Sequence, residues 1–135
     1  MGGPSNSNIS GDKTENSKGF FDYWIVKTDS IGIIQWQNTI GGNGSDYLRS
    51  IVQSLDGGYI LGGFSDSNIS GDKTEDSNGD RDYWILKTDS SGLIQWQNSI
   101  GGSKDDELNS IKQCNDGGLI IGGLSHSPIS GDKTE

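Results

Sequence analysis

Residues 47–65 read YLRSIVQSLDGGYILGGFS, and residues 82–100 read DYWILKTDSSGLIQWQNSI. Each stretch holds two short runs rich in Ile, Leu, Val and aromatic residues, separated by a turn that contains Gly. Such runs, bounded by clusters of Asp, Asn, Ser and Gly, are typical of β-strands. We therefore expect four strands, joined in sequence order as an antiparallel meander, over 48–54, 59–65, 82–88 and 93–100.

The turns and one strand carry glycines with specific backbone roles. Asp56-Gly57 supplies the positive φ angle of a tight hairpin. In the second turn, Asp89 caps the turn and Gly92 takes the left-handed position. Gly62-Gly63, inside a predicted strand, predicts that a neighbouring strand or a large ring approaches closely.

The chain repeats itself at an interval of 60 residues. Of the 60 residue pairs formed by 7–66 and 67–126, 40 are identical. The motif Ile-Ser-Gly-Asp-Lys-Thr-Glu occurs three times, at 9–15, 69–75 and 129–135. A repeat of this size buries its apolar faces by stacking on neighbouring repeats, so the fold is expected at the level of a stack.

Both faces of the predicted sheet carry apolar side chains. The strand over 93–100 places Ile94 and Trp96 on one face and Leu93 on the other. A sheet with two apolar faces needs cover on both sides, and the radial stacking of a β-propeller supplies it. We expect Trp36 and Trp96 to fill the space between sheets. The predicted fold class is therefore all-β, with propeller blades of four-stranded antiparallel meanders and two blades' worth per chain.

Several motifs resemble known repeats: Asp-Gly-Gly-Tyr-Ile at 56–60, Asp-Tyr-Trp-Ile-Val-Lys at 22–27, and Ile-Gln-Trp-Gln at 34–37 and 94–97. They are similar to repeats of long secreted or surface proteins of bacteria and archaea, and to the kelch class of propeller repeats. The resemblance implies a propeller fold and a secreted or cell-surface parent protein, and it implies little about activity. Met1 to Pro4 lead directly into repeat sequence, so no signal peptide is expected in this chain.

The phase of the repeat divides the chain. We expect a partial repeat that forms a loop (1–21), a half blade with the third and fourth strands (22–46), a complete blade (47–100), a half blade with the first and second strands (101–125), and a loop tail (126–135). The last half blade of one chain is predicted to pair with the first half blade of another, closing a homo-oligomeric ring. Natural propellers have about 4 to 8 blades, which favours a trimer or a tetramer. The alternative is a fragment of a longer array with no independent function.

The loop before the third strand presents oxygen ligands at alternate positions, like the first half of a calcium loop: Asp66, Asn68, Ser70 and Asp72. A structural alternative starts from Ser-Gly-Asp-Lys-Thr-Glu, which stays constant between the repeats. In that alternative Asp72 accepts backbone N–H groups in an Asx turn, and Lys73 and Glu75 form exposed ion pairs. Both hypotheses stay open, and no cofactor other than calcium is predicted.

Composition argues against several classes of function. The formal net charge is −9, and the ten Lys and Arg residues are spread along the chain, so nucleic acid is not an expected partner. No apolar run approaches the roughly 18 residues of a membrane span, so membrane insertion is not expected. The chain has one His and one Cys, His126 and Cys114, and an enzyme is not expected.

Two functions remain. The leading prediction is a non-enzymatic propeller repeat module, a scaffold or adhesion surface that assembles from two-blade chains. The alternative is a carbohydrate-binding lectin with one glycan site per repeat. In the lectin, sugar rings would stack on aromatic side chains of Tyr23, Trp24, Tyr47, Tyr59, Tyr83 and Trp84.

Overall fold

The computed structural model describes residues 1–135 and contains strands but no helix. The strands are β1 (Gly2–Ser5), β2 (Asp22–Thr28), β3 (Ile34–Ile40), β4 (Asp46–Gln53), β5 (Tyr59–Ser65), β6 (Asp82–Thr88), β7 (Ile94–Ile100), β8 (Asp106–Gln113) and β9 (Leu119–Ser125). The strands predicted over 59–65 and 82–88 have the same bounds in the structure. A helix with the length and hydropathy of a membrane span is absent.

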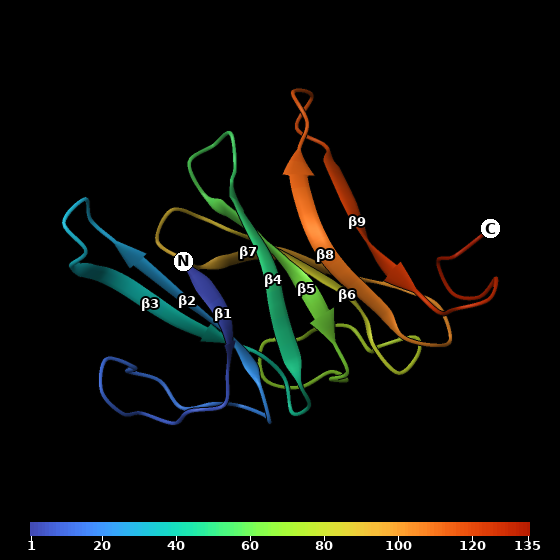
Figure 1. Ribbon diagram of the computed structural model, residues 1–135, viewed down its shortest axis with the longest axis horizontal. Coiled ribbons are helices and arrows are strands. Elements are labelled where there is room, and N and C mark those ends of the chain that lie inside the picture. Colours follow the sequence, from blue (N-terminus) through green and yellow to red (C-terminus); the bar gives the residue numbers. More distant parts are fainter.

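The strands form three antiparallel sheets in chain order. The first sheet contains β1, β2 and β3, the second contains β4 to β7, and the third contains β8 and β9. Figure 1 shows β3 and β9 at opposite ends of the molecule, with the second sheet between them. The second sheet is the predicted meander, with the strand order β4-β5-β6-β7. The all-β, antiparallel class is confirmed.

Strand β1 corrects the expectation that residues 1–21 form only a loop. It pairs antiparallel with β2 and places Gly2 opposite Ile25. In the second sheet β5 pairs with β6 in the same register, with Gly62 opposite Ile85. Over four residues β1 therefore occupies the position that β5 occupies over seven. The sequence Gly-Gly-Pro-Ser lacks the β-branched alternation by which a strand is recognised.

Both faces of the second sheet are covered, as the apolar pattern predicted. A cluster between the first and second sheets contains Tyr23, Ile25, Ile40, Leu48, Leu61, Trp84 and Leu86. A cluster between the second and third sheets contains Ile60, Ile85, Leu108 and Ile111. Removal of these side chains from water is the main force that holds the three sheets together.

The glycines behave as the sequence indicated. Gly57 and Gly92 have φ angles of 85° and 89°, which are left-handed conformations at the two predicted turns. Gly63 lies where β4 comes close to β5, and a Cβ atom at this position would lie 1.8 Å from the carbonyl oxygen of Tyr47. A backbone atom cannot move aside as the end of a side chain can.

This crowding yields a test of the fold. Gly63→Ala should lower the free energy of unfolding by about 2 kcal/mol or more, because β4 must shift to admit the methyl group. The matched control is Gly3→Ala in β1, where an added Cβ meets nothing within 4 Å. It should change stability by less than about 0.5 kcal/mol. Urea denaturation measures both, and equal losses would show that close approach of β4 is not the cause.

Candidate functional site

The predicted calcium loop is held by the connection between β3 and β4. The side chains of Asp66, Ser70 and Asp72 accept hydrogen bonds from backbone N–H groups within residues 41–45, at 2.5 to 3.1 Å. The Ser70 hydroxyl donates a hydrogen bond to the backbone carbonyl oxygen of Asn68, at 2.9 Å. Asp72 therefore ties two segments together and does not close a local Asx turn. No cluster of three or more His, Cys, Asp or Glu side chains is arranged to hold a metal ion, and calcium binding stays a prediction.

Lys73 corrects the expectation of exposed ion pairs. Its side chain is buried, with only 2% of the residue exposed. The Nζ atom donates to the carbonyl oxygens of Ser67 and Glu75, at 2.8 and 3.0 Å, and to Ser77 Oγ at 3.2 Å. Burial lowers the pKa of the Lys73 ammonium. The loop is thus folded around the buried Lys73 ammonium, which donates hydrogen bonds to oxygen atoms of the loop.

These contacts explain why the heptapeptide is constant. Lys13 and Lys133 occupy the same place in their own loops and donate to the carbonyl oxygens of Ser7 and Ser127. Glu75 accepts a hydrogen bond from a backbone N–H of β7 at 2.7 Å, so it fastens the loop to the sheet. The Lys and Glu residues that stay constant between the repeats therefore make hydrogen bonds within the protein.

Four of the six aromatic residues proposed for sugar stacking, Tyr23, Tyr47, Tyr59 and Trp84, pack against other aromatic rings inside the protein. Tyr47 lies between Phe21 and Phe64, with ring centroids 5.1 and 5.0 Å away. Trp36 of the first sheet meets Tyr59 of the second edge-on, at 5.7 Å, which confirms its predicted place between sheets. Glycan binding stays a prediction.

The junction between the first and second sheets is built around Tyr23 and Trp84. Their ring centroids are 5.0 Å apart, and Tyr23 Oη donates to the Trp84 carbonyl oxygen at 3.0 Å. Both residues are fully buried, and burial raises the pKa of Tyr23 well above its usual value. Asn38 Nδ2 also donates to the Gly92 carbonyl oxygen at 2.9 Å, so the turn after β6 covers the end of the first sheet.

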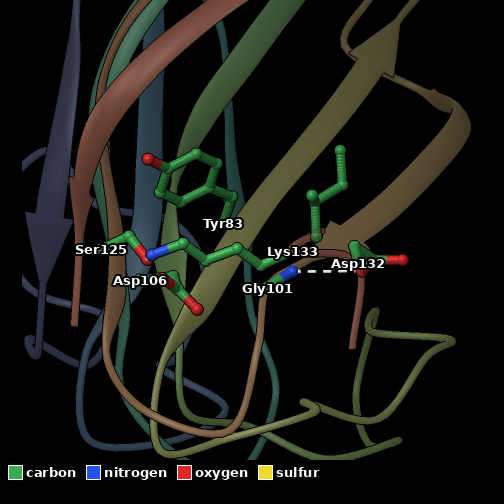
Figure 2. Close-up of a pocket in the computed structure, with 7 residues that line it drawn as sticks. Tyr83, Gly101, Asp106, Ser125, Asp132 and Lys133 are labelled. Carbon is green, nitrogen blue, oxygen red and sulfur yellow. Dashed lines mark hydrogen bonds between the residues drawn. The ribbon is translucent and has the colours of Figure 1, made fainter. Parts of the chain in front are cut away.

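An open counterpart of this junction lies between the second and third sheets. A pocket of about 230 Å³ is lined by Tyr83, Ile100, Gly101, Asp106, Ser125, Asp132 and Lys133. Figure 2 shows the Tyr83 ring beside the Lys133 side chain, with Asp106 and Ser125 next to the ammonium. Each lining residue stands 60 positions after a residue of the same type, and Tyr83 corresponds to Tyr23. Tyr83 is half-buried, and its hydroxyl reaches the Leu124 carbonyl oxygen at 3.4 Å.

A second pocket, of about 360 Å³, lies beside Trp24 and β1. Trp24 is half-buried, whereas Trp84, the equivalent residue of the second repeat, is fully buried. The first pocket contains Tyr83, the equivalent of Tyr23, and the second contains Trp24, the equivalent of Trp84. Together the two pockets therefore present the two residue types of the Tyr23–Trp84 contact. One offers a tyrosine and the other a tryptophan. Sequence reasoning missed this pairing, although both residue types are identical in the two repeats.

Four aspartates begin strands at the junctions and are buried: Asp22, Asp46, Asp82 and Asp106. Burial raises the pKa of Asp46, and the negative charge of Asp22 adds to this, against hydrogen bonds from Ser65, Gly42 N–H and Ser67. Burial also raises the pKa of Asp82. One oxygen of each of Asp22, Asp46 and Asp82 has no hydrogen-bond partner. Charged carboxylates at Asp46 and Asp82 therefore oppose folding. At Asp106 hydrogen bonds outweigh the effect of burial and lower the pKa.

The chain matches no protein-family model. It is similar to "Regulatory protein FlaEY" of Caulobacter vibrioides, with 26% identity over 119 residues that cover 84% of the chain. The chain spans 12% of the length of that protein.

The buried loop lysine can be tested by substitution. Lys73→Ala should lower the free energy of unfolding by about 2 kcal/mol, because the loop oxygens that bind the ammonium lose their donor inside the protein. The control is Lys104→Ala, since Lys104 is exposed; its change should stay within about 0.5 kcal/mol. Thermal and urea denaturation measure both. A harmless Lys73→Ala would contradict the structural role of the motif.

The buried carboxyl predicts a pH dependence with a defined sign. Because the pKa of Asp46 is raised in the folded state, the native protein holds an extra proton between the ordinary value of about 4 and the raised value. The contribution of Asp46 to the free energy of unfolding is therefore most favourable in acid, and it falls as the pH rises from the ordinary pKa to the raised one. Relative to wild type, Asp46→Asn should be most favourable at neutral pH and lose that advantage as pH falls.

Asp89→Asn is the opposite control for this experiment. Hydrogen bonds, first from the Ser91 side chain and then from the Leu93 N–H, lower the pKa of Asp89. Its contribution is present at neutral pH and is lost in acid, so Asp89→Asn should be costly at neutral pH and harmless in acid. Urea denaturation at several pH values compares the two variants. Parallel curves for both would rule out this assignment of the pKa shifts.

Proposed function

We propose that this chain is a non-enzymatic β-propeller repeat module that assembles with copies of itself and presents a scaffold or adhesion surface. The observation that carries the proposal is the open half-sheet formed by β8 and β9. The side chains of Ile120 and Leu124 on β9 are 62% and 56% exposed. Their counterparts on β5, Ile60 and Phe64, are 1% and 2% exposed. Ile60 is covered by the third sheet, through Leu108 and Ile111, and Phe64 stacks on Tyr47 of β4.

A second copy of the chain is the partner that fits β9. The outer edge of β9 has no strand beside it in the third sheet, and an apolar edge of this kind is a template for another strand. In the second sheet the strand beside β5 is β6, residues 82–88. The sequence of β2, residues 22–28, matches β6 at every position except Val26, where β6 has Leu86. Each chain therefore carries both the edge and a strand that complements it.

Stacking of such sheets leads to the propeller. The three sheets follow one another in chain order, and the second sheet is packed on both faces. If each junction between copies repeats this packing, three chains supply six four-stranded blades and four supply eight. Both numbers lie within the roughly 4 to 8 blades of propellers. The interface joins different surfaces of the two copies, so it closes into a ring or propagates as a filament.

A second candidate is a segment of a longer array, in which further repeats of the same chain cover β9. It is favoured by the similarity to a Caulobacter vibrioides protein of which this chain spans 12%. Addition of one further 60-residue repeat separates the candidates. In an array the added repeat covers β9 within the chain, and the protein stays monomeric.

The proposed assembly is tested by the mass of the native protein. Native mass spectrometry and light scattering at micromolar to millimolar concentration should give three or four times the 14.4 kDa of one chain. The reason is that burial of the β9 face needs a second chain. Far-UV circular dichroism checks that the sample is folded. A folded monomer throughout that range would overturn the proposed function.

A further inference from the structure

The two ends of the chain compete for one position. Residues 1–15 and 121–135 stand 120 positions apart, and 11 of the 15 pairs are identical. Residues 1–15 contain β1, which already covers the edge of β2. β9 of a second copy cannot pair with β2 while β1 is in place. We name residues 1–15 the N-terminal arm and residues 119–135 the C-terminal arm.

We infer that the copies assemble by arm exchange: the C-terminal arm of one copy displaces the N-terminal arm of another, and Trp24 of that second copy fills the pocket beside Tyr83. The inference rests on the proposed self-assembly and specifies the surface that it uses. The contacts follow from the second sheet, in which the same sequences already meet.

The exchanged pairing offers more contacts than the one it replaces. β1 pairs with β2 over four residues, and Met1 adds one reciprocal hydrogen-bonded pair with Val26. By comparison, β5 pairs with β6 over seven residues, and β9 has the length of β5. Tyr83 Oη gains the Trp24 carbonyl oxygen of the second copy, as Tyr23 binds Trp84 within the chain. Ile120 loses its exposure to water, which favours the exchanged form.

The turns at the two ends of the interface are complementary as well. Asn38 binds the Gly92 carbonyl oxygen inside the chain, so Asn98 of one copy can bind the Gly32 carbonyl oxygen of the next. The Lys87 ammonium lies 2.9 Å from the Asp56 carboxylate in the second sheet. The equivalent charges in the exchanged form are Lys27 of one copy and Asp116 of the other.

The contacts that the N-terminal arm gives up are restored by the incoming arm. Gln37 on β3 binds the backbone of the arm, accepting a hydrogen bond from Thr14 N–H and donating to the Asp12 carbonyl oxygen. The incoming arm brings Asp132 and Thr134 in the same motif. Exchange therefore conserves the loop contacts and adds the ladder positions that the N-terminal arm lacks, the Tyr–Trp contact and the two turn contacts.

Gly2 and Gly122 provide a matched pair of variants with opposite expected effects. A Cβ at Gly2 would lie 2.7 and 2.8 Å from the side chains of Ile51 and Leu48, whereas a Cβ at Gly122 meets nothing within 4 Å. After exchange, Gly122 takes the place of Gly2 against Leu48 and Ile51 of the second copy. Gly2→Glu should loosen the N-terminal arm and increase the oligomeric fraction, and Gly122→Glu should leave the monomer folded and abolish the oligomer.

Trypsin gives a readout that needs no variant. Lys13 is 3% exposed, with its ammonium bound to the Ser7 carbonyl oxygen, so the docked arm resists cleavage. In the exchanged form the arm is released, and the bond after Lys13 should be cut many times faster than in the monomer. Limited proteolysis of separated monomer and oligomer, followed by mass spectrometry, measures the difference.

The outcomes separate the inference from the function on which it rests. Opposite shifts for Gly2→Glu and Gly122→Glu, together with rapid cleavage in the oligomer, support arm exchange. An oligomer that resists trypsin at Lys13 and forms equally well from Gly122→Glu overturns arm exchange and leaves self-assembly standing. Wild type and Gly2→Glu that are both monomeric overturn self-assembly as well. If Gly122→Glu fails to fold, the proteolysis result decides alone.

Discussion

The contact of Tyr23 with Trp84 is the interaction on which the stacking of the sheets depends. The ring of Tyr23 and the indole of Trp84 fill the space between two sheets, and the hydroxyl of Tyr23 finds its partner on the neighbouring backbone. A sheet with apolar residues on both faces cannot stay in water alone, so each sheet depends on the next. The contact is made once inside the chain. Its equivalent residues, Tyr83 and Trp24, line pockets at the two ends of the stack.

Close packing of the sheets buries polar groups, and the loops supply hydrogen-bond partners for them. The strands that begin at the junctions start with aspartates whose carboxyl groups are buried, and burial of such groups is unfavourable without partners. Serine hydroxyls and backbone N–H groups of the Gly-Gly connections supply part of the missing hydrogen bonds, for example Gly42 N–H and Ser67 Oγ to Asp46. The buried ammonium of Lys73 holds the loop that carries Ser67 in position. The polar loop is therefore part of the core.

The sequence was informative where residues act through local patterns. Short apolar runs bounded by clusters of Asp, Asn, Ser and Gly located β5 and β6 to the residue, and the Gly62-Gly63 pair indicated a close approach that the structure contains. Lys73 was misjudged because lysine is seldom buried, and only the shape of a folded loop brings three oxygen partners to its ammonium. β1 was missed because its position is set by pairing with β2 and by space beside Leu48, not by its own composition.

The duplicated arms set up a competition whose outcome depends on concentration. The N-terminal arm belongs to the same chain as β2, so its effective concentration is on the order of millimolar, while an arm from another copy is present only at the protein concentration. Each tenfold difference in concentration is worth about 1.4 kcal/mol. The incoming arm must therefore gain more from its extra contacts than the resident arm gains from its tether. The added ladder positions and the Tyr83–Trp24 contact act only in the exchanged form, and closure of a ring applies the same gain at every junction while it removes the last exposed β9 edge.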